Sequence, residues 1–273
     1  MKFAIFVQDN RIPDNNGGSI VLLHHAHTLR ELGHEVEFLS LTDDIPKADY
    51  VIVQSEWSNH KQFDHRNLII WLGHFNPAKK YQMPKNMRAL HFFTQWKGDC
   101  VEEAEHNLNQ KIHYLPHGIC SCNTEGKQIQ SPQTIFIGAN YKERDQDWLE
   151  GVERIQCHHE QAKNYYKSAR VSPNLHGAFQ LNKKTEYMQT PGRMVNDRVF
   201  NIIASGGFCI SDNPMTREFY DADEVPVAKT KGEYQMLINH FLNNPEKRLS
   251  YMEKAKKKDY TYKKYYKEFL KNL

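Results

Sequence analysis

The stretch RMVNDRVFNIIASGGFCISD, residues 193–212, decides the fold. Its apolar residues recur at helical spacing up to two glycines, and a short apolar run follows, which predicts a helix, a tight turn and a strand. Arg198, Asn201 and Ser205 are spaced three and four residues apart, so one face of this helix is predicted to present a cation, an amide and a hydroxyl. A surface helix with a charged face and a glycine cap remains the alternative interpretation.

Further apolar runs extend the pattern in both directions. Residues 3–7 are a short, wholly apolar run, which is typical of a parallel strand buried on both faces. Further strands are predicted at residues 34–40, 50–53, 68–72, 89–93 and 111–115. Gly17 and Gly18 precede a predicted helix at residues 20–32, so strand, glycine loop, helix and strand form a βαβ unit. The glycine spacing is not a dinucleotide fingerprint. The remaining helices are predicted at residues 146–155, 161–169 and 232–242.

A polar segment without hydrophobic periodicity, residues 120–133, divides the chain of 273 residues. We therefore predict an α/β protein with two Rossmann-like domains facing a cleft. The predicted parts are an acceptor domain at residues 1–120, a donor domain at 121–250 and a basic, aromatic C-terminal helix at 251–273. This last segment is expected to pack back across the domains, although its lysines also leave open a nucleic-acid or membrane surface.

The composition limits which binding partners and which cellular compartment we expect. Net charge is +3, with 36 Lys and Arg against 33 Asp and Glu, which does not by itself indicate nucleic-acid binding. Five scattered cysteines favour free thiols in a reducing compartment. The N-terminal apolar run is too short for a signal peptide, and no run is long enough for a transmembrane segment, so we expect a cytoplasmic protein. Cys120 and Cys122, with Cys157, invite a zinc interpretation, but their spacing lacks the paired geometry of structural zinc sites, and no metal is expected.

Three blocks occur in an order that is similar to a known family: IFIGANYKER at residues 135–144, YYKSARVSPNLH at 165–176 and NDRVFNIIASGGF at 196–208. They resemble the bacterial spore-maturation type of glycosyltransferase with the GT-B architecture, over residues 134–265. The first 117 residues match only the general pattern of the N-terminal domain. The resemblance implies a metal-independent transferase that uses a nucleoside-diphosphate-sugar donor, UDP-sugar above all, with no other cofactor and with retention of configuration.

The resemblance and the strand ends together nominate the site residues. His74 and Glu56 follow strand ends and are the catalytic or positioning candidates. The donor contacts are expected among residues in the glycine loop and the three blocks: Gly17, Gly18, Lys142, Arg144, Asn174, His176, Arg193, Asn196, Arg198, Asn201 and Gly206. Cations and a helix N-terminus suit the negative charge of a departing diphosphate.

One position departs from the family. Asn201 stands where the family has a glutamate that holds the donor ribose, and an amide accepts a hydroxyl proton less strongly than a carboxylate does. Two other functions therefore stay open: a sugar-nucleotide 2-epimerase and a catalytically inactive nucleotide-sugar-binding module. The acceptor is not decoded by the sequence and could be a glycan, a protein or nucleic acid, and the oligomeric state is unknown.

Overall fold

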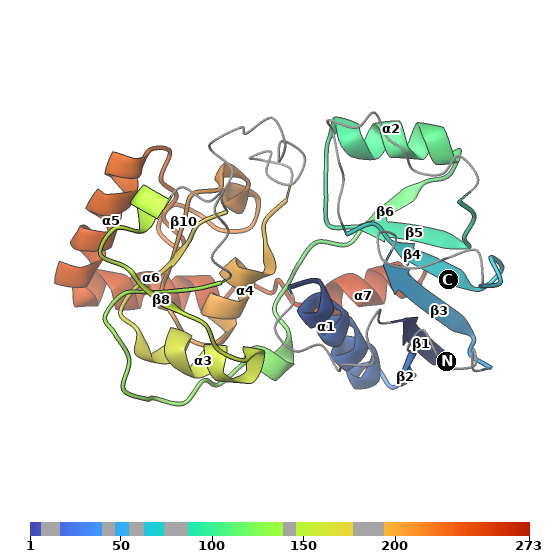
Figure 1. Ribbon diagram of the computed structural model, residues 1–273, viewed down its shortest axis with the longest axis horizontal. Coiled ribbons are helices and arrows are strands. Elements are labelled where there is room, and N and C mark those ends of the chain that lie inside the picture. Colours follow the sequence, from blue (N-terminus) through green and yellow to red (C-terminus); the bar gives the residue numbers. More distant parts are fainter. Residues whose placement is uncertain (7–16, 40–46, 55–62, 74–86, 139–145, 177–193) are drawn as a thin grey trace. The chain divides into compact units, whose positions relative to one another are not determined.

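The protein is described here by a computed structural model that covers residues 1–6, 17–39, 47–54, 63–73, 87–138, 146–176 and 194–273 (Figure 1). The chain divides into two compact units. Unit 1 comprises Met1–Pro116 together with Tyr262–Leu273, and unit 2 comprises His117–Thr261. Each unit has its own α/β architecture.

Unit 1 is built on a six-stranded parallel sheet with the order β2-β1-β3-β4-β5-β6. All six strands lie at the apolar runs that predicted them. They are β1 (Lys2–Phe6), β2 (Glu35–Leu39), β3 (Tyr50–Gln54), β4 (Leu68–Trp71), β5 (His91–Thr94) and β6 (Ile112–Tyr114). The residues of β4 are all buried, as expected of a central parallel strand covered on both faces.

Helices cover both faces of this sheet. On one face, α1 (Gly17–Glu31) and α7 (Tyr262–Leu270) lie side by side, and α2 (Asp99–Leu108) lies on the other (Figure 1). Phe3, Ile52 and Phe93 of the sheet join Leu29 of α1 and Tyr266 of α7 in one hydrophobic cluster. The aromatic face of α7 is therefore part of the core of unit 1.

Unit 2 contains two pairs of parallel strands, β7 (Ile135–Ile137) with β8 (Glu153–Ile155) and β9 (Ser172–Asn174) with β10 (Cys209–Ser211). A single parallel bridge, Thr134 to Val171, joins the pairs. Because the strands are parallel, their carboxyl ends lie at the same edge. The helical segments are α3 (His159–Ser168), α4 (Asp197–Ala204), α5 (Lys231–Asn243), α6 (Pro245–Lys256) and the short 3₁₀ turns η2 (Ser121–Asn123), η3 (Gln146–Leu149) and η4 (Pro214–Glu218).

The strands of unit 2 separate two hydrophobic clusters. Ile135 and Cys209 pack with α3 and α4 in one cluster, and Phe136 and Ile210 pack with α5 in the other. Side chains alternate in this way because successive residues of a strand point to opposite faces. Unit 2 therefore has helices on both faces of its strands, as predicted for an α/β unit.

Several local predictions were wrong. Residues 146–155 are not a helix, because the 3₁₀ turn η3 ends at Leu149, Gly151 takes a positive φ of 74° and β8 follows. The segment 251–273 is not one helix: α6 ends at Lys256 and α7 begins at Tyr262. Helix α1 begins at Gly17 and not at residue 20. Helix α2 was not predicted, since its buried residues, Cys100 and Ala104, are small.

Among the described residues, no helix combines the length and the apolar composition needed to cross a bilayer.

Candidate functional site

The carboxyl ends of the unit 2 strands and the first turn of α4 meet at one place, which we call the α4 site. It comprises Ile137, residues 174–176, residues 211–213 and the start of α4 at residues 196–198. Arg198, in the first turn of α4, donates hydrogen bonds to carbonyl oxygens of Ile137 and Leu175. These bonds place the N-terminus of the helix at the carboxyl edge of β7 and β9.

Arg198 is the cation of this site and is half-buried. Its Nε donates to the Ile137 carbonyl at 2.9 Å, and its Nη1 donates to Asn174 Oδ1 at 3.1 Å and to the Leu175 carbonyl at 3.4 Å. The guanidinium carbon lies 4.7 Å from the ring centroid of Phe136. None of the described hydrogen bonds uses Nη2, so Nε and Nη1 are held by the protein while Nη2 can meet a ligand.

Asn174 and Ser211 are the buried polar residues that close the ends of β9 and β10. Neither side chain is exposed, and Asn174 Nδ2 donates to Ser211 Oγ at 3.4 Å. Asn174 therefore uses its oxygen to orient Arg198 and its nitrogen to bind the neighbouring strand. Asn174 was predicted as a donor contact; in the structure it holds Arg198, and its contact with a donor stays a prediction.

Asp212 is a fully buried carboxylate immediately after β10. Both of its oxygens lie 2.8 Å from the backbone nitrogen of His176, which donates to them. A charge-assisted bond of this kind is about twice as strong as a neutral one, and it fixes the turn that follows β9. The sequence analysis nominated His176 and overlooked Asp212, although a polar Asp-Asn pair directly after an apolar run was a usable signal.

The N-terminus of α4 has no side-chain cap. Asn196 occupies the N-cap position without a side-chain capping bond, and its buried Oδ1 has no hydrogen-bond partner in the described part of the chain. Uncapped N–H groups and the positive end of the helix dipole attract anions. The first turn also holds Asp197, which the sequence analysis did not single out.

Asn201 and Ser205 point away from Arg198, towards η2. Asn201 Oδ1 accepts a bond from Asn123 Nδ2 at 2.6 Å, and Ser205 Oγ donates to the Asn123 carbonyl at 3.2 Å. Asn201 Nδ2 donates to Asp197 Oδ2 at 3.1 Å. The expectation that one face presents all three groups to a ligand is wrong, because both ends of the Asn201 amide already have protein partners.

Gly206 lies at the opposite end of α4 from Arg198. It has a φ of +80°, and a Cβ added there would meet the Lys167 and Lys256 ammonium groups at 3.0 and 3.2 Å. At Gly207 a Cβ would meet the Tyr166 carbonyl at 2.6 Å. The two glycines therefore end the helix and admit the backbone of α3. Gly206 does not belong to the carboxyl edge where a donor was expected.

Burial keeps the acids around the α4 site neutral. It raises the pKa values of the Tyr166 phenol and the Cys209 thiol, although nearby Arg198 opposes the rise. Burial first, and then the charge of Asp212, also raise the pKa of Tyr234 well above its usual value. Burial lowers the pKa of His159, which Asp197 partly offsets.

In unit 1, buried polar side chains contact the backbone at Gly73, which directly precedes His74 in the chain. The Gly73 carbonyl accepts bonds from Gln95 Nε2 at 2.7 Å and from Trp96 Nε1 at 2.8 Å. Trp71 Nε1 donates to Gln95 Oε1 at 2.7 Å. These buried side chains, which the sequence analysis missed, fix the backbone just before His74. Gly17 and Gly18 form the first turn of α1, in the same unit.

Five predicted site residues lie outside the described residues: Glu56, His74, Lys142, Arg144 and Arg193. Their roles stay predictions.

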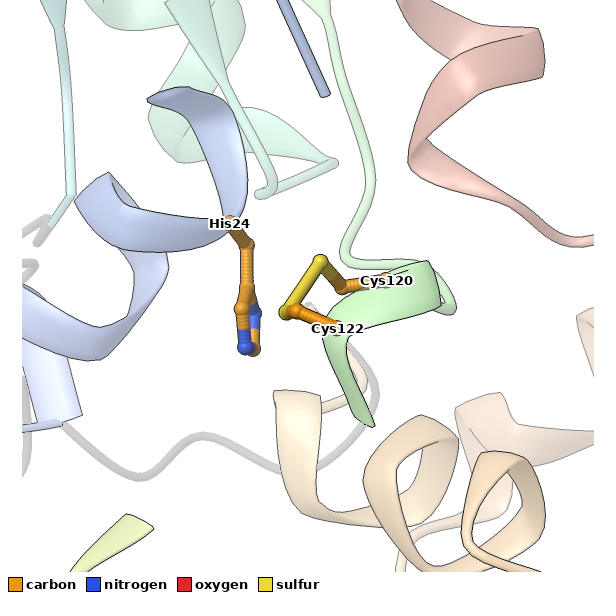
Figure 2. Close-up of side chains that lie close together, drawn as sticks. All are labelled: His24, Cys120 and Cys122. Carbon is orange, nitrogen blue, oxygen red and sulfur yellow. A yellow bond between two sulfur atoms is a disulfide. The ribbon is translucent and has the colours of Figure 1, made fainter. Parts of the chain in front are cut away.

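Cys120 and Cys122 are joined by a disulfide, with their Cα atoms 5.2 Å apart (Figure 2). The expectation of five free thiols is therefore wrong for this pair, whereas Cys100, Cys157 and Cys209 are free. Counting and spacing gave no sign of the pairing, which depends on the tight η2 turn that brings the two residues within bonding range. A sulfur in a disulfide is not a thiolate, so the zinc interpretation of this spacing loses its ligands.

A known sequence family matches this chain. The sequence model of a glycosyl transferase-like family matches residues 126–271, just over half of the chain. The chain belongs to the glycosyl transferase-like family. The matched residues include the whole α4 site. They lie in unit 2 and in α7. No curated protein sequence matches it significantly.

Solved structures confirm the GT-B fold. An α-glucosyltransferase in complex with UDP-glucose and DNA containing an abasic site matches with a TM-score of 0.67 and 12% identity, over 99% of this chain and 98% of the other. The T4 phage β-glucosyltransferase in complex with UDP-glucose matches at 0.66 and 11% identity, over 100% and 99%. AviGT4, a glycosyltransferase of avilamycin A biosynthesis, matches at 0.61 and 11% identity, over 99% and 96%.

Proposed function

We propose that this glycosyltransferase moves a sugar from a UDP-sugar to an acceptor, and that the α4 site binds the diphosphate of the donor. The observation that supports this most is the uncapped N-terminus of α4 beside the held guanidinium of Arg198, within the segment that matches the family. Departure of a nucleoside diphosphate leaves negative charge on its phosphate oxygens. Fixed N–H groups and a fixed cation stabilise that charge without reorganising.

The side chains of the α4 site then have distinct roles. Arg198 and the first N–H groups of α4 bind phosphate oxygens, and Asn196 offers its buried oxygen to a donor hydroxyl. Asn174 and Asp212 orient these groups, the first through Arg198 and the second through the backbone of His176. Lys142, Arg144 and Arg193 are proposed as further phosphate contacts, and no metal ion takes part.

For the acceptor we propose DNA. Two α-glucosyltransferases that share the fold over nearly their full length were solved with DNA, one of them with a 13-mer containing a HMU base. Both of those complexes contain a uridine nucleotide. His74 and Glu56 in unit 1 are proposed as catalytic or positioning residues, and Gly17 and Gly18, at the N-terminus of α1, as further donor contacts. Retention of configuration is proposed from the resemblance of residues 134–265 to the spore-maturation type.

A transfer assay tests the proposal. The protein is incubated with radiolabelled UDP-glucose and with duplex DNA that contains, or lacks, a hydroxymethylated pyrimidine. Label in the DNA with release of UDP, and an α-linked product by NMR, would support donor, acceptor and retention. Hydrolysis or transfer to sugars alone would remove DNA as the acceptor, and a β-linked product would remove retention.

The same assay separates the other functions. Conversion of UDP-N-acetylglucosamine to a different sugar nucleotide without acceptor would indicate the 2-epimerase. Binding of UDP without any turnover across the acceptor panel would indicate an inactive binding module. If neither UDP nor any UDP-sugar raises the melting temperature, the proposal of a UDP-sugar site is contradicted.

A further inference from the structure

The turn η2 at the start of unit 2 is a rigid element with no assigned role. The disulfide joins its N-cap residue Cys120 to Cys122 within the turn (Figure 2). The backbone nitrogen of Asn123 donates to the Cys120 carbonyl at 3.0 Å. Thr124 Oγ1 donates to the Ser121 carbonyl at 2.7 Å and closes the other side of the turn. A covalent link and two hydrogen bonds over five residues leave Asn123 little conformational freedom.

Asn123 is joined to α4 at two points. Its Nδ2 donates to Asn201 Oδ1 at 2.6 Å. Its carbonyl lies 3.2 Å from Ser205 Oγ and shares the single hydroxyl proton with the Asn201 carbonyl, which is 2.7 Å from the same oxygen. The three residues are 3%, 8% and 2% exposed, so water does not replace these bonds if one is lost. The penalty for breaking them is therefore that of leaving buried polar atoms unpaired.

The line of hydrogen bonds ends at the first turn of α4. Asn201 Nδ2 donates to Asp197 Oδ2 at 3.1 Å, and Asp197 precedes Arg198. An ionised carboxylate only accepts, so the amide of Asn201 must turn its nitrogen to Asp197 and its oxygen to Asn123. Residue 123 must then donate. This polarity requires a donor at position 123, which asparagine supplies and an ionised aspartate does not.

We propose that Asn123 is a positioning residue for donor binding: through Asn201 and Asp197 it fixes the first turn of α4, and with it Arg198. The proposal rests on the proposed function of the α4 site. It gives a role to the amide at position 201, where the resembling family has a glutamate. The N-cap residue Asn196 makes no capping bond, so this line of bonds takes over the fixing of the first turn that a side-chain cap would otherwise provide.

The test uses the donor-to-acceptor direction of the hydrogen bonds that join Asn123, Asn201 and Asp197. Asn123→Asp places a carboxylate against Asn201 Oδ1. In Asn123→Asp with Asp197→Asn, the Asn201 amide can rotate by 180° and satisfy both neighbours in the reverse direction. Asp197→Asn alone is the reference for the loss of the Asp197 charge. Asn164→Asp on α3 is the matched control, because its Oδ1 already accepts from the Lys127 nitrogen at 2.8 Å and the same charge is added.

Two readouts are taken on the full chain at a temperature where every variant is folded by circular dichroism. Hydrogen exchange of the unliganded protein is expected to speed up at residues 194–205 in Asn123→Asp and to recover in the double variant. The Kd for UDP, by calorimetry, is expected to rise about tenfold in Asn123→Asp and to return to within about threefold of Asp197→Asn in the double variant. Asn164→Asp should match the wild type in both readouts.

If Asn123→Asp does not fold, Asn123→Ala removes the donor without adding charge and is expected to change both readouts in the same direction. Unchanged exchange and unchanged UDP affinity in the position 123 variants would overturn the proposal, as would a double variant no better than Asn123→Asp. If wild-type protein does not bind UDP, the proposed donor fails, and the exchange data alone then decide whether Asn123 positions α4.

Discussion

At the scale of single residues, the protein uses polar side chains mainly to hold other groups in place. Asn174 orients Arg198, Asp212 fixes the backbone of His176, and Asn201 joins Asn123 to Asp197. Arg198, Asn174 and His176 could be predicted to lie near one another, because they follow strand ends or begin a helix. Whether such a residue contacts a ligand or positions another group cannot be read from the sequence, since that depends on which partner each amide or carboxylate meets in the folded chain.

Arg198→Ala is expected to reduce both stability and UDP binding. It removes three hydrogen bonds and the contact with the Phe136 ring, and leaves the Ile137 carbonyl without its described donor. We expect the free energy of unfolding to fall by about 1–3 kcal/mol and the UDP affinity to fall at least tenfold, by urea unfolding and calorimetry. Arg198→Lys should keep the charge but not the planar fork. Arg170→Ala, at an exposed position, is the control. An equal loss of stability and of UDP affinity in this variant would contradict a specific role for Arg198.

Asp212→Asn is expected to destabilise unit 2. The new amide offers one oxygen to the His176 nitrogen and turns its own nitrogen towards a backbone donor, in a place without solvent. The expected loss is about 1–3 kcal/mol in the free energy of unfolding, from urea titration. Asp223→Asn removes an exposed carboxylate that pairs with Lys254 and should leave the unfolding midpoint unchanged. Equal midpoints for the two variants would argue against a buried structural role for Asp212.

At the scale of helices and strands, elements that bury many apolar residues were predicted, and elements that bury few were missed or misassigned. The unit 1 strands were predicted because central parallel strands are continuously apolar. Helix α2 was missed because only Cys100 and Ala104 are buried on it, and residues 146–155 were misassigned because a 3₁₀ turn and a short strand mimic one amphipathic helix. The η2 disulfide had no signal in the spacing. In each case the structure depends on contacts made in the folded chain, which a local sequence pattern does not show.

The contact of α7 with β5 and β6 predicts a pH dependence. The His91 and His113 rings lie 5.3 Å apart, and both face Phe269. Burial lowers both pKa values; each is lowered further by a positive neighbour, His113 beside His91 and Lys111 beside His113, while Glu105 opposes the shift at His113. A base whose pKa falls on folding is protonated more readily when unfolded, so stability is present above about pH 6.5 and is lost as pH falls.

We therefore expect the free energy of unfolding, from urea titration by Trp fluorescence, to be lower at pH 5.5 than at pH 7.5. The double variant His91→Gln, His113→Gln should flatten this difference, because glutamine does not titrate. A wild-type protein equally stable at both pH values would contradict the assignment.

The η2 disulfide predicts a specific labelling pattern. Of five cysteines, three are free, so unreduced protein denatured in iodoacetamide should be alkylated at Cys100, Cys157 and Cys209 and at neither Cys120 nor Cys122. Prior reduction should give five labelled sites. Peptide mass spectrometry distinguishes the two results. Five labels without reductant would show that η2 is not closed by a disulfide.

At the scale of the whole molecule, family and fold are better determined than chemistry. The family match covers residues 126–271, and the GT-B fold is shared over nearly the full chain with structures only 10–12% identical to it. The family and the fold, which were predicted from three short blocks, are confirmed. The individual donor contacts stay predictions, because hydrogen bonds within the protein show which groups are held in place and not which groups meet a ligand.

Hydrogen exchange of the full-length protein with and without UDP is the most direct test of the central claim. Bound diphosphate should slow exchange at the carboxyl edge of unit 2, in peptides that contain residues 136–138, 174–176, 196–200 and 211–213. The Gly206 end of α4 should change less, since it lies at the far end of the helix. Slowed exchange confined to unit 1 or to residues 204–208, or no change at saturating UDP, would contradict a donor site at the start of α4.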